Sequence, residues 1–226
     1  MRIFLFAICL AFIVPVWAEA ELSPEALENW FESDDQAHSY IDNISEGELR
    51  FLRKPPDKRV PTMVNEITIL ITSVETGWVN IHQCHEDLDP ITAVEVVYRY
   101  HKMRNLKINS TENIKKAWVE GLSVQLEEVS YEASLCVSLQ ARILYKDGER
   151  HFALRNGPFE RKFLDGYYPL HVQLNVHYPV DKLHFMGSKP VAAPGFTVRQ
   201  TDASVFVDAW FEGKLMTEML FEIADE

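Results

Sequence analysis

Apolar and polar residues alternate with a period of two over most of the chain after residue 64. The clearest runs cover residues 67–71, 134–145, 171–177 and 205–212. This period is typical of antiparallel strands that bury one face and expose the other. Further strands are predicted over residues 78–83, 92–98, 106–109, 124–129, 151–155, 182–185, 196–199 and 215–221.

Turn signals separate these runs. Asp147 and Gly148 stand between two strand patterns and predict a hairpin. One segment competes as a helix, because Ile114, Ala117 and Trp118 have helical spacing and Gly121 is placed to end a helix. Many short strands with regular turns predict an all-β fold, mainly an antiparallel β-sandwich or an open barrel.

The first twenty residues form a different pattern. Arg2 precedes an apolar run over residues 3–14, and a small-residue end follows Pro15. This is the pattern of a secretory signal peptide, with cleavage after Ala18 or Ala20. The apolar run is shorter than the roughly 20 residues of a membrane-spanning helix. We therefore expect a periplasmic or secreted protein that is not an integral membrane protein after cleavage.

Residues 21–61 predict an N-terminal arm. Ser23 can cap a short helix over residues 22–31. Residues 50–61 hold five basic residues and three prolines, which favours an extended linker. This linker either balances acidic neighbours or docks an anionic partner. The predicted organisation is a signal peptide (1–20), a helical and proline-rich arm (21–61) and a β-sandwich domain (62–226).

The composition narrows the function classes. Asp and Glu number 34 against 22 Lys and Arg, a net charge of −12. An acidic body repels phosphate backbones, so nucleic acid is excluded as an expected partner. The sequence holds no P-loop, dinucleotide fingerprint or nucleophile elbow, and we expect no cofactor. Sequons at Asn43 and Asn109 would carry glycans only in a eukaryotic host.

Two cysteines remain after signal cleavage, Cys84 and Cys136, and an oxidising compartment favours a disulfide between them. The alternation places Cys136 on one face with Ser138, and Cys84 on one face with His82. Both faces are polar. We therefore predict a bridge on an outer face or at a strand end, unlike the buried bridge of an immunoglobulin domain.

The densest cluster of chemistry-bearing residues surrounds Cys84. His82, His85 and Glu86 offer imidazole and carboxylate ligands, as a zinc or copper site would. On a continuous strand His82 and His85 point to opposite faces, so a shared ion needs a turn at Cys84.

A candidate binding surface lies on the last predicted strands. Phe206, Asp208, Trp210 and Glu212 alternate on one side of a strand whose other side is core. Aromatic rings beside carboxylates suit sugar binding, although these rings could also lie under another segment. Asp208 and Glu212 would be about 13 Å apart along a strand, too far for a glycosidase pair. The neighbouring aromatic turn adds Tyr167 and Tyr168 as binding candidates.

These features predict a binding or interaction module of the cell envelope, whose partner is an envelope protein or a glycan. The first alternative is a periplasmic or secreted hydrolase acting on glycans or peptides. The second is a metal-handling periplasmic protein built on His82, His85 and Glu86.

Overall fold

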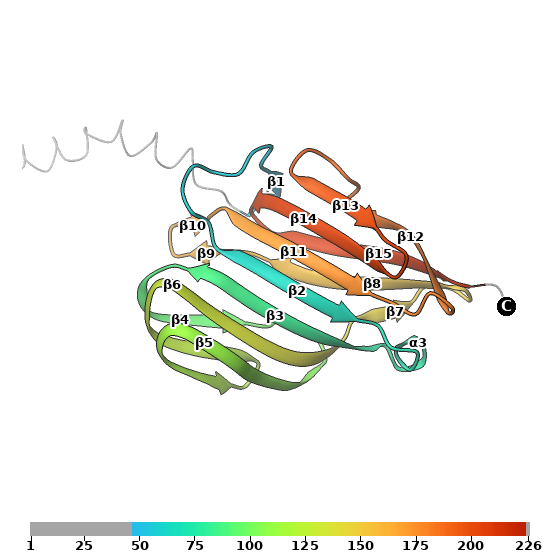
Figure 1. Cartoon of the computed structure of the whole chain (residues 1–226), viewed down its shortest axis with the longest axis horizontal. Helices are drawn as coiled ribbons and strands as arrows, with labels where there is room; N and C mark the ends of the chain where they lie inside the picture. The colour runs from blue at the N-terminus through green and yellow to red at the C-terminus, as the bar shows by residue number, and fades with distance from the viewer. Residues whose placement is uncertain (1–46, 225–226) are drawn as a thin grey trace, which may run out of the picture. The chain divides into compact units, whose positions relative to one another are not determined.

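A computed structural model describes residues 47–224 (Figure 1). The predicted signal peptide and the predicted helix over residues 22–31 lie outside these residues. The described chain forms fifteen strands and one short helix, α3 (Ser73–Thr76). The strands are β1 (Arg50–Phe51), β2 (Thr62–Thr68), β3 (Trp78–Leu88), β4 (Ile91–Val97), β5 (Met103–Glu120), β6 (Ser123–Arg142), β7 (Leu144–Lys146), β8 (His151–Phe159), β9 (Lys162–Phe163), β10 (Gly166–Tyr167), β11 (Leu170–His177), β12 (Leu183–Lys189), β13 (Phe196–Gln200), β14 (Ser204–Glu212) and β15 (Leu215–Ile223).

The larger sheet has nine strands. Its main path runs β1-β14-β11-β2-β3-β6-β4, with β13 on β14 and β5 on β6. Neighbours are antiparallel except β11 and β2, which pair in parallel. β5 pairs with β6 along almost its whole length. β3 and β4 therefore share the other side of β6, β3 with its second half and β4 with its first.

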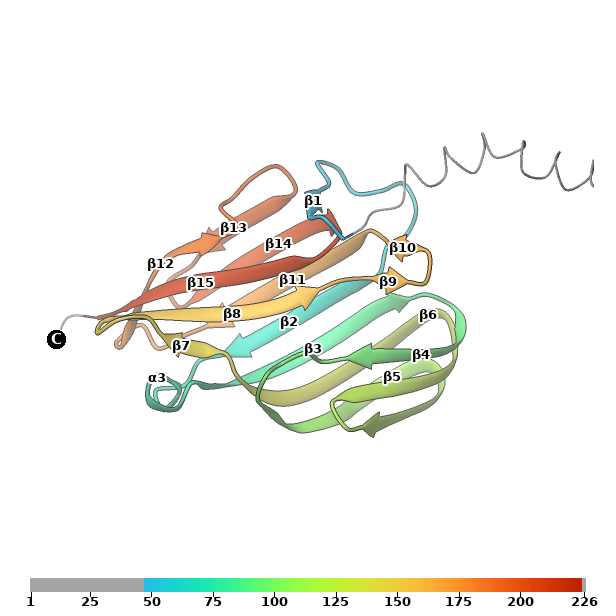
Figure 2. The same ribbon diagram turned by 180° about the vertical axis from the view of Figure 1, so that it is seen from behind.

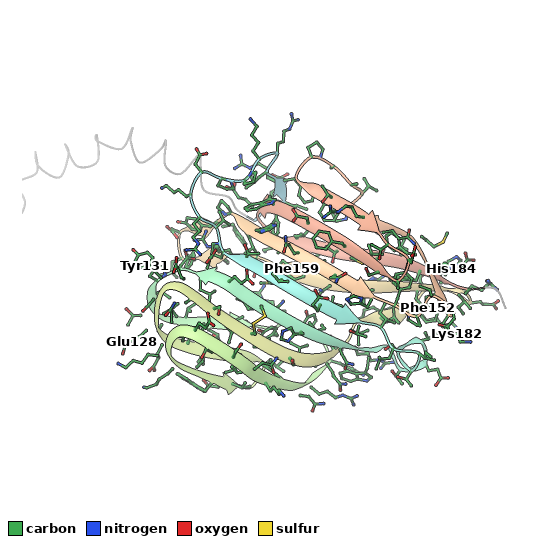
Figure 3. The ribbon with its side chains drawn as sticks, in the orientation of Figure 1. Glu128, Tyr131, Phe152, Phe159, Lys182 and His184 are labelled. Atoms are coloured by element: carbon green, nitrogen blue, oxygen red, sulfur yellow. A yellow bond between two sulfur atoms is a disulfide. The ribbon has the colours of Figure 1, made fainter. Side chains whose placement is uncertain are left out.

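The smaller sheet has four strands in the order β12-β15-β8-β7, and Figure 2 shows it covering one face of the larger sheet. One apolar core joins the two sheets. Phe152 and Phe159 of β8, labelled in Figure 3, are buried in it. Phe196, Phe211 and Ile67 enter the same core from the larger sheet. The described residues therefore form the predicted all-β sandwich.

The predicted alternation holds along β14. Its inward residues are Val205, Val207, Ala209 and Phe211, and all are fully buried. The predicted hairpin at Asp147 and Gly148 is also present, because β7 and β8 pair antiparallel across it.

The predicted helical competitor at residues 114–121 is wrong, since these residues lie in and just after β5. The pairing of β5 with β6 has three register shifts, and Asn105 and Asn113 adopt positive φ angles within them. An extra residue in a bulge moves the next side chains to the other face. From Ile114 to Glu120, however, the pairing has no shift, and every side chain there is exposed or half-buried. A strand segment without a buried face needs no period of two, and the helical spacing of Ile114 and Ala117 is incidental.

The disulfide between Cys84 and Cys136 is present and joins β3 to β6. The two residues are direct cross-strand partners, with Cα atoms 4.1 Å apart. Both side chains lie on the outer face of the larger sheet, since the inward neighbours Gln83, Leu135 and Val137 are buried. The bridge is thus on an outer face, as the parity of the sequence predicts.

The basic linker begins as part of the sheet. Arg50 and Phe51 form β1 against β14, and the ring of Phe51 packs on Phe196. Farther along, Arg59 forms ion pairs with Asp87 and Glu132. At this position the linker balances acidic neighbours. In the described part of the chain, no helix has the length and apolarity that a membrane span requires.

Candidate functional site

The predicted binding residues of β14 lie side by side on the outer face of the larger sheet. Phe206, Asp208, Trp210 and Glu212 are all half-buried there. The parallel register of β11 and β2 continues this face, so that Trp210 stands opposite His171, and His171 opposite Thr62. We call the surface formed by Phe206, Asp208, Trp210, His171 and Gln173 the Trp210 face.

The centre of the Trp210 face is held in one arrangement. The rings of Trp210 and His171 stack with centroids 3.9 Å apart and 11° between their planes. His171 Nε2 lies 3.1 Å from Asp208 Oδ2, and its Nδ1 lies 3.2 Å from Thr62 Oγ1. Gln173 donates a second hydrogen bond to Asp208 Oδ2, at 3.0 Å. A carboxylate oriented by two neighbours therefore lies beside a partly exposed indole.

Both ends of the β14 row carry an arginine. The guanidinium of Arg199 lies over the ring of Phe206, 4.9 Å from its centroid. Arg50 forms an ion pair with Glu212. The charge of Glu212 is thereby paired with a cation, whereas Asp208 lies at the middle of the outward-facing residues of β14.

The two tyrosines of the predicted surface have contacts outside the Trp210 face. Tyr167 lies between Lys162 and Lys214, and its hydrogen bond with Lys214 raises the pKa of that lysine. The Tyr168 ring packs edge-on against Phe163 and near Arg161. The β9–β10 hairpin thus carries its two tyrosines into different surroundings.

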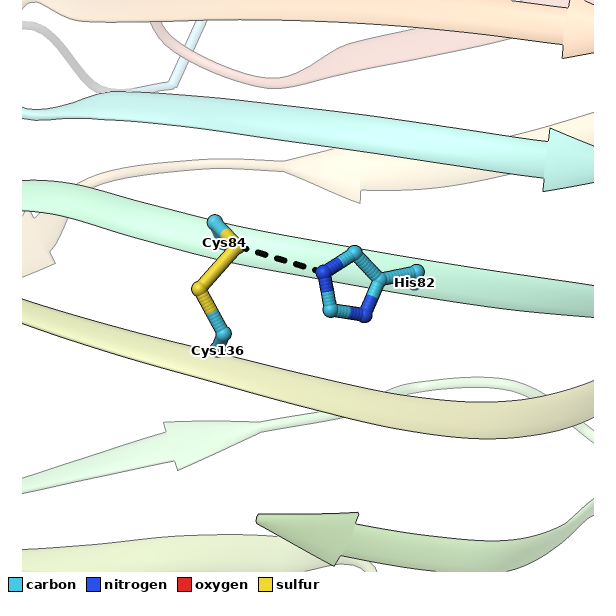
Figure 4. Close-up of side chains that lie close together, drawn as sticks. All are labelled: His82, Cys84 and Cys136. Carbon is cyan, nitrogen blue, oxygen red and sulfur yellow. Dashed lines mark hydrogen bonds between the residues drawn. A yellow bond between two sulfur atoms is a disulfide. The ribbon is translucent and has the colours of Figure 1, made fainter. Parts of the chain in front are cut away.

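The proposed metal ligands are not brought together either. β3 continues to Leu88 without the necessary turn, so His82 and Glu86 are exposed on the outer face while His85 is buried on the inner face. His82 instead contacts the disulfide, with Nε2 3.5 Å from Cys84 Sγ (Figure 4). His82, Cys84 and Cys136 cluster within 4.8 Å, but their two sulfurs are bonded to each other and are not thiolates.

His85 belongs to a buried polar chain that sequence reasoning missed. Its Nε2 lies 3.1 Å from Gln83 Oε1, and Gln83 in turn donates a hydrogen bond to Asn65 Oδ1. The Tyr98 hydroxyl lies 3.5 Å from the same Nε2. All four residues are buried. Burial lowers the pKa of His85 to about 4, so its imidazole is neutral at physiological pH.

The buried chain ends at a groove with a volume of about 320 Å³. One wall comes from β2, β3 and β4, and the other from β8, β9 and the residues between them. Arg161 binds Asp89 through two hydrogen bonds at the rim, and Arg99 forms an ion pair with Glu160. Glu160 Oε2 is buried and has no hydrogen-bond partner among the described residues. The remaining lining is mainly apolar: Pro61, Met63, Leu88, Ile91, Val94, Val96, Val97, Pro158, Phe163 and Leu170.

One signal in the sequence could have indicated this groove. The inward positions of β2 and β3 are apolar at Ile67, Val79 and Ile81, but Gln83 and His85 interrupt the same parity with polar residues. Buried polar side chains are uncommon and are normally satisfied by partners. A change from apolar to polar residues on a core face therefore marks a place where the close-packed apolar interior gives way to a polar cluster or a groove.

Comparison with known proteins identifies no family. No family model matches the sequence, and no curated protein matches it. Among solved structures, the chain is similar to an M1 zinc metallopeptidase from Deinococcus radiodurans, with a TM-score of 0.37 and 8% identity. A mutant of that peptidase bound to a Tyr-Ser-Ala substrate gives a TM-score of 0.38 and 9% identity. Each match covers 79% of this chain and 43% of the other, so the chain spans less than half of those proteins. A likeness this weak carries no argument about function.

Proposed function

We propose that the protein is an exported, non-enzymatic binding module, and that the Trp210 face binds a saccharide of the cell envelope. The observation that supports this most is Asp208, oriented by His171 and Gln173 beside the half-buried Trp210 ring. A glycan offers hydroxyl donors and flat patches of C–H groups. An oriented carboxylate accepts from the former, and an indole ring packs on the latter.

Two properties of the face favour a neutral or weakly polar ligand over a charged one. Glu212 is paired with Arg50, which removes one negative charge from the end of the row. Gln173 and Asn175 extend the face along β11 with amide groups, which both donate and accept hydrogen bonds. Because strand backbones hold these groups, little conformational entropy is lost when a ligand binds.

Export is part of the same proposal. The disulfide between Cys84 and Cys136 fits an oxidising compartment. The pattern of the first twenty residues adds the expectation of a signal peptide, with the envelope or the extracellular medium as destination.

Isothermal titration calorimetry with defined neutral oligosaccharides, such as chitotetraose and cellotetraose, tests the proposal. Trp210→Ala should weaken binding at least tenfold, about 1.4 kcal/mol. Asp208→Asn should weaken it as well, since an amide oxygen is a poorer acceptor than a carboxylate. Trp118→Ala is the matched control, because Trp118 is an exposed tryptophan on β5, away from the face. Equal losses for Trp210→Ala and Trp118→Ala would contradict the proposal.

A second candidate is the hydrolase, and one observation favours it. A chain of hydrogen bonds joins the hydroxyl of Thr62 to the imidazole of His171, and that imidazole to the carboxylate of Asp208. In a catalytic triad the nucleophile, the base and the acid that orients the base are joined in this order. A fluorophosphonate probe would label an activated hydroxyl covalently, and mass spectrometry would place the adduct on Thr62. An unlabelled wild-type protein, or equal labelling of Thr62→Ala, would remove this candidate.

A further inference from the structure

The groove at the end of the buried polar chain runs along the edge of β4. Four consecutive residues line it: Val94, Glu95, Val96 and Val97. Successive side chains of a strand point to opposite faces, so a cavity beside only one face would touch alternate residues. Contact with consecutive residues means that the groove lies against the strand's edge. Of the described strands, β6 alone pairs with β4. Within residues 47–224, the edge along the groove is therefore open.

The direction of the backbone groups on this edge follows from one hydrogen bond. The amide of Tyr98 donates to the carbonyl of Leu122, on the β6 side. Backbone groups alternate sides along a strand, and the pairing of residues 93–97 with β6 has no register shift. The N–H and C=O groups of Val96 thus face β6. Those of Glu95 and Val97 face the open edge.

β4 lacks the usual protection of an edge strand. Natural edges carry charges, prolines or bulges that prevent pairing with another chain. Along β4 only Glu95 is charged, and the pairing from Ala93 to Val97 has no bulge. Val97 is largely exposed at the end of the strand. Apolar, β-branched and unpaired, this edge is suited to accept one more strand.

The far wall of the groove supplies what the inserted strand would pack on. Pro158 and Phe163 contribute apolar surface from β8 and β9. The charged lining residues are three acids and three bases, and Arg99 and Arg161 are each bound to a carboxylate. The groove therefore has no net charge, although the protein is strongly acidic. An apolar, extended segment suits this lining better than a charged ligand does.

We propose that this groove is a peptide-binding site, in which an extended segment with alternating apolar side chains adds to the open edge of β4. Main-chain hydrogen bonds to Glu95 and Val97 would hold the segment, and its alternate side chains would enter the groove. The site is separate from the Trp210 face and does not rest on the saccharide proposal.

The probe is a fluorescent octapeptide that alternates valine and threonine, with one lysine and one glutamate added at its ends. Fluorescence anisotropy with the full mature chain measures its affinity. Val97→Pro removes an N–H from the open edge without removing a bond to β6, and should weaken binding at least tenfold. Val97→Thr is the matched control. It keeps the N–H and a similar shape, and should bind within about twofold of the wild type.

A second pair of probes keeps the test decisive if Val97→Pro fails to fold. Two isomers of the peptide carry N-methyl groups on alternate residues, one isomer on each edge of the strand. A bound peptide pairs with β4 through one of its two edges, so the isomer methylated on that edge should lose binding and the other should keep it. Trp210→Ala should leave the peptide affinity unchanged, which separates this site from the Trp210 face.

Three results would overturn the proposal. The first is equal binding of the two N-methylated isomers, and the second is unchanged binding by a folded Val97→Pro variant. The third is no binding of the probe up to about 1 mM. If sedimentation shows that the chain itself dimerises and that Val97→Pro makes it monomeric, the edge pairs with a second copy and the peptide proposal is wrong.

Discussion

Protonation of His85 should reduce the stability of the fold, and the structure sets the size of the effect. Burial lowers the pKa of this imidazole from 6.5 to about 4. In the unfolded chain the group takes up a proton near its ordinary pKa, so below that value the unfolded state binds more protons than the folded one. Stability therefore rises with pH across this window and is lost as pH falls. Each pKa unit corresponds to about 1.4 kcal/mol, which makes the complete loss about 3.5 kcal/mol.

Between about pH 7.5 and pH 4.5 most of that loss, about 2.5 kcal/mol, should appear in urea unfolding curves. His85→Gln is the comparison. Glutamine does not titrate and can still donate to Gln83 Oε1. Carboxylates with lowered pKa values also destabilise the fold in acid, as Glu218 does through Lys189 and Arg155. Both proteins share them, so only the difference between their curves reports His85. Parallel curves for the wild type and His85→Gln would refute the reasoning.

Three further predictions concern the disulfide, a close approach and the core. Replacing Cys84 and Cys136 by serine opens a loop with a sequence separation of 52 and should cost about 4 kcal/mol in urea unfolding. The wild-type protein in excess dithiothreitol should then unfold at the same urea concentration as the variant. A urea midpoint that does not change on reduction or substitution would contradict this prediction. Gly213→Ala should lower the free energy of unfolding by about 2 kcal/mol or more, because Gly213 has φ +89° and a Cβ there would overlap the Glu48 carbonyl oxygen. An unchanged Tm would show that Glu48 does not pack against Gly213. Phe221→Ala should cost about 3–5 kcal/mol, since this ring is fully buried between Tyr178 and Phe185; a loss below about 1 kcal/mol would show that the core repacks.

The sequence predicts the fold wherever one strand face meets the core without interruption. β14 shows this directly, because its inward Val207 and outward Asp208 follow strict parity. The same parity predicts that the disulfide between Cys84 and Cys136 lies outside. Such predictions succeed because a one-residue slip would move every apolar side chain to the solvent face.

Prediction fails where a strand has no buried face, or where segments distant in the sequence decide the outcome. No side chain of β5 around Ile114 is buried, so its apolar residues show no period of two and their local spacing favours the wrong element. Most of the groove has no local signature in the sequence, because His85, Val97 and Arg161 come from separate strands and connections. Only the interruption of the apolar parity at Gln83 and His85 hints at it.

The buried polar chain connects the stability prediction with the peptide site. A sandwich interior made only of apolar side chains would be easier to stabilise than one holding Asn65, Gln83 and His85, because each buried polar group needs a partner. These groups lie on the inner faces of β2 and β3, and His85 reaches the groove beside β4. The polar chain thus lies where the apolar core borders the groove. A segment added to β4 would pack in the groove that His85 lines and extend the core there. The polar residues would then form part of the wall of the peptide site.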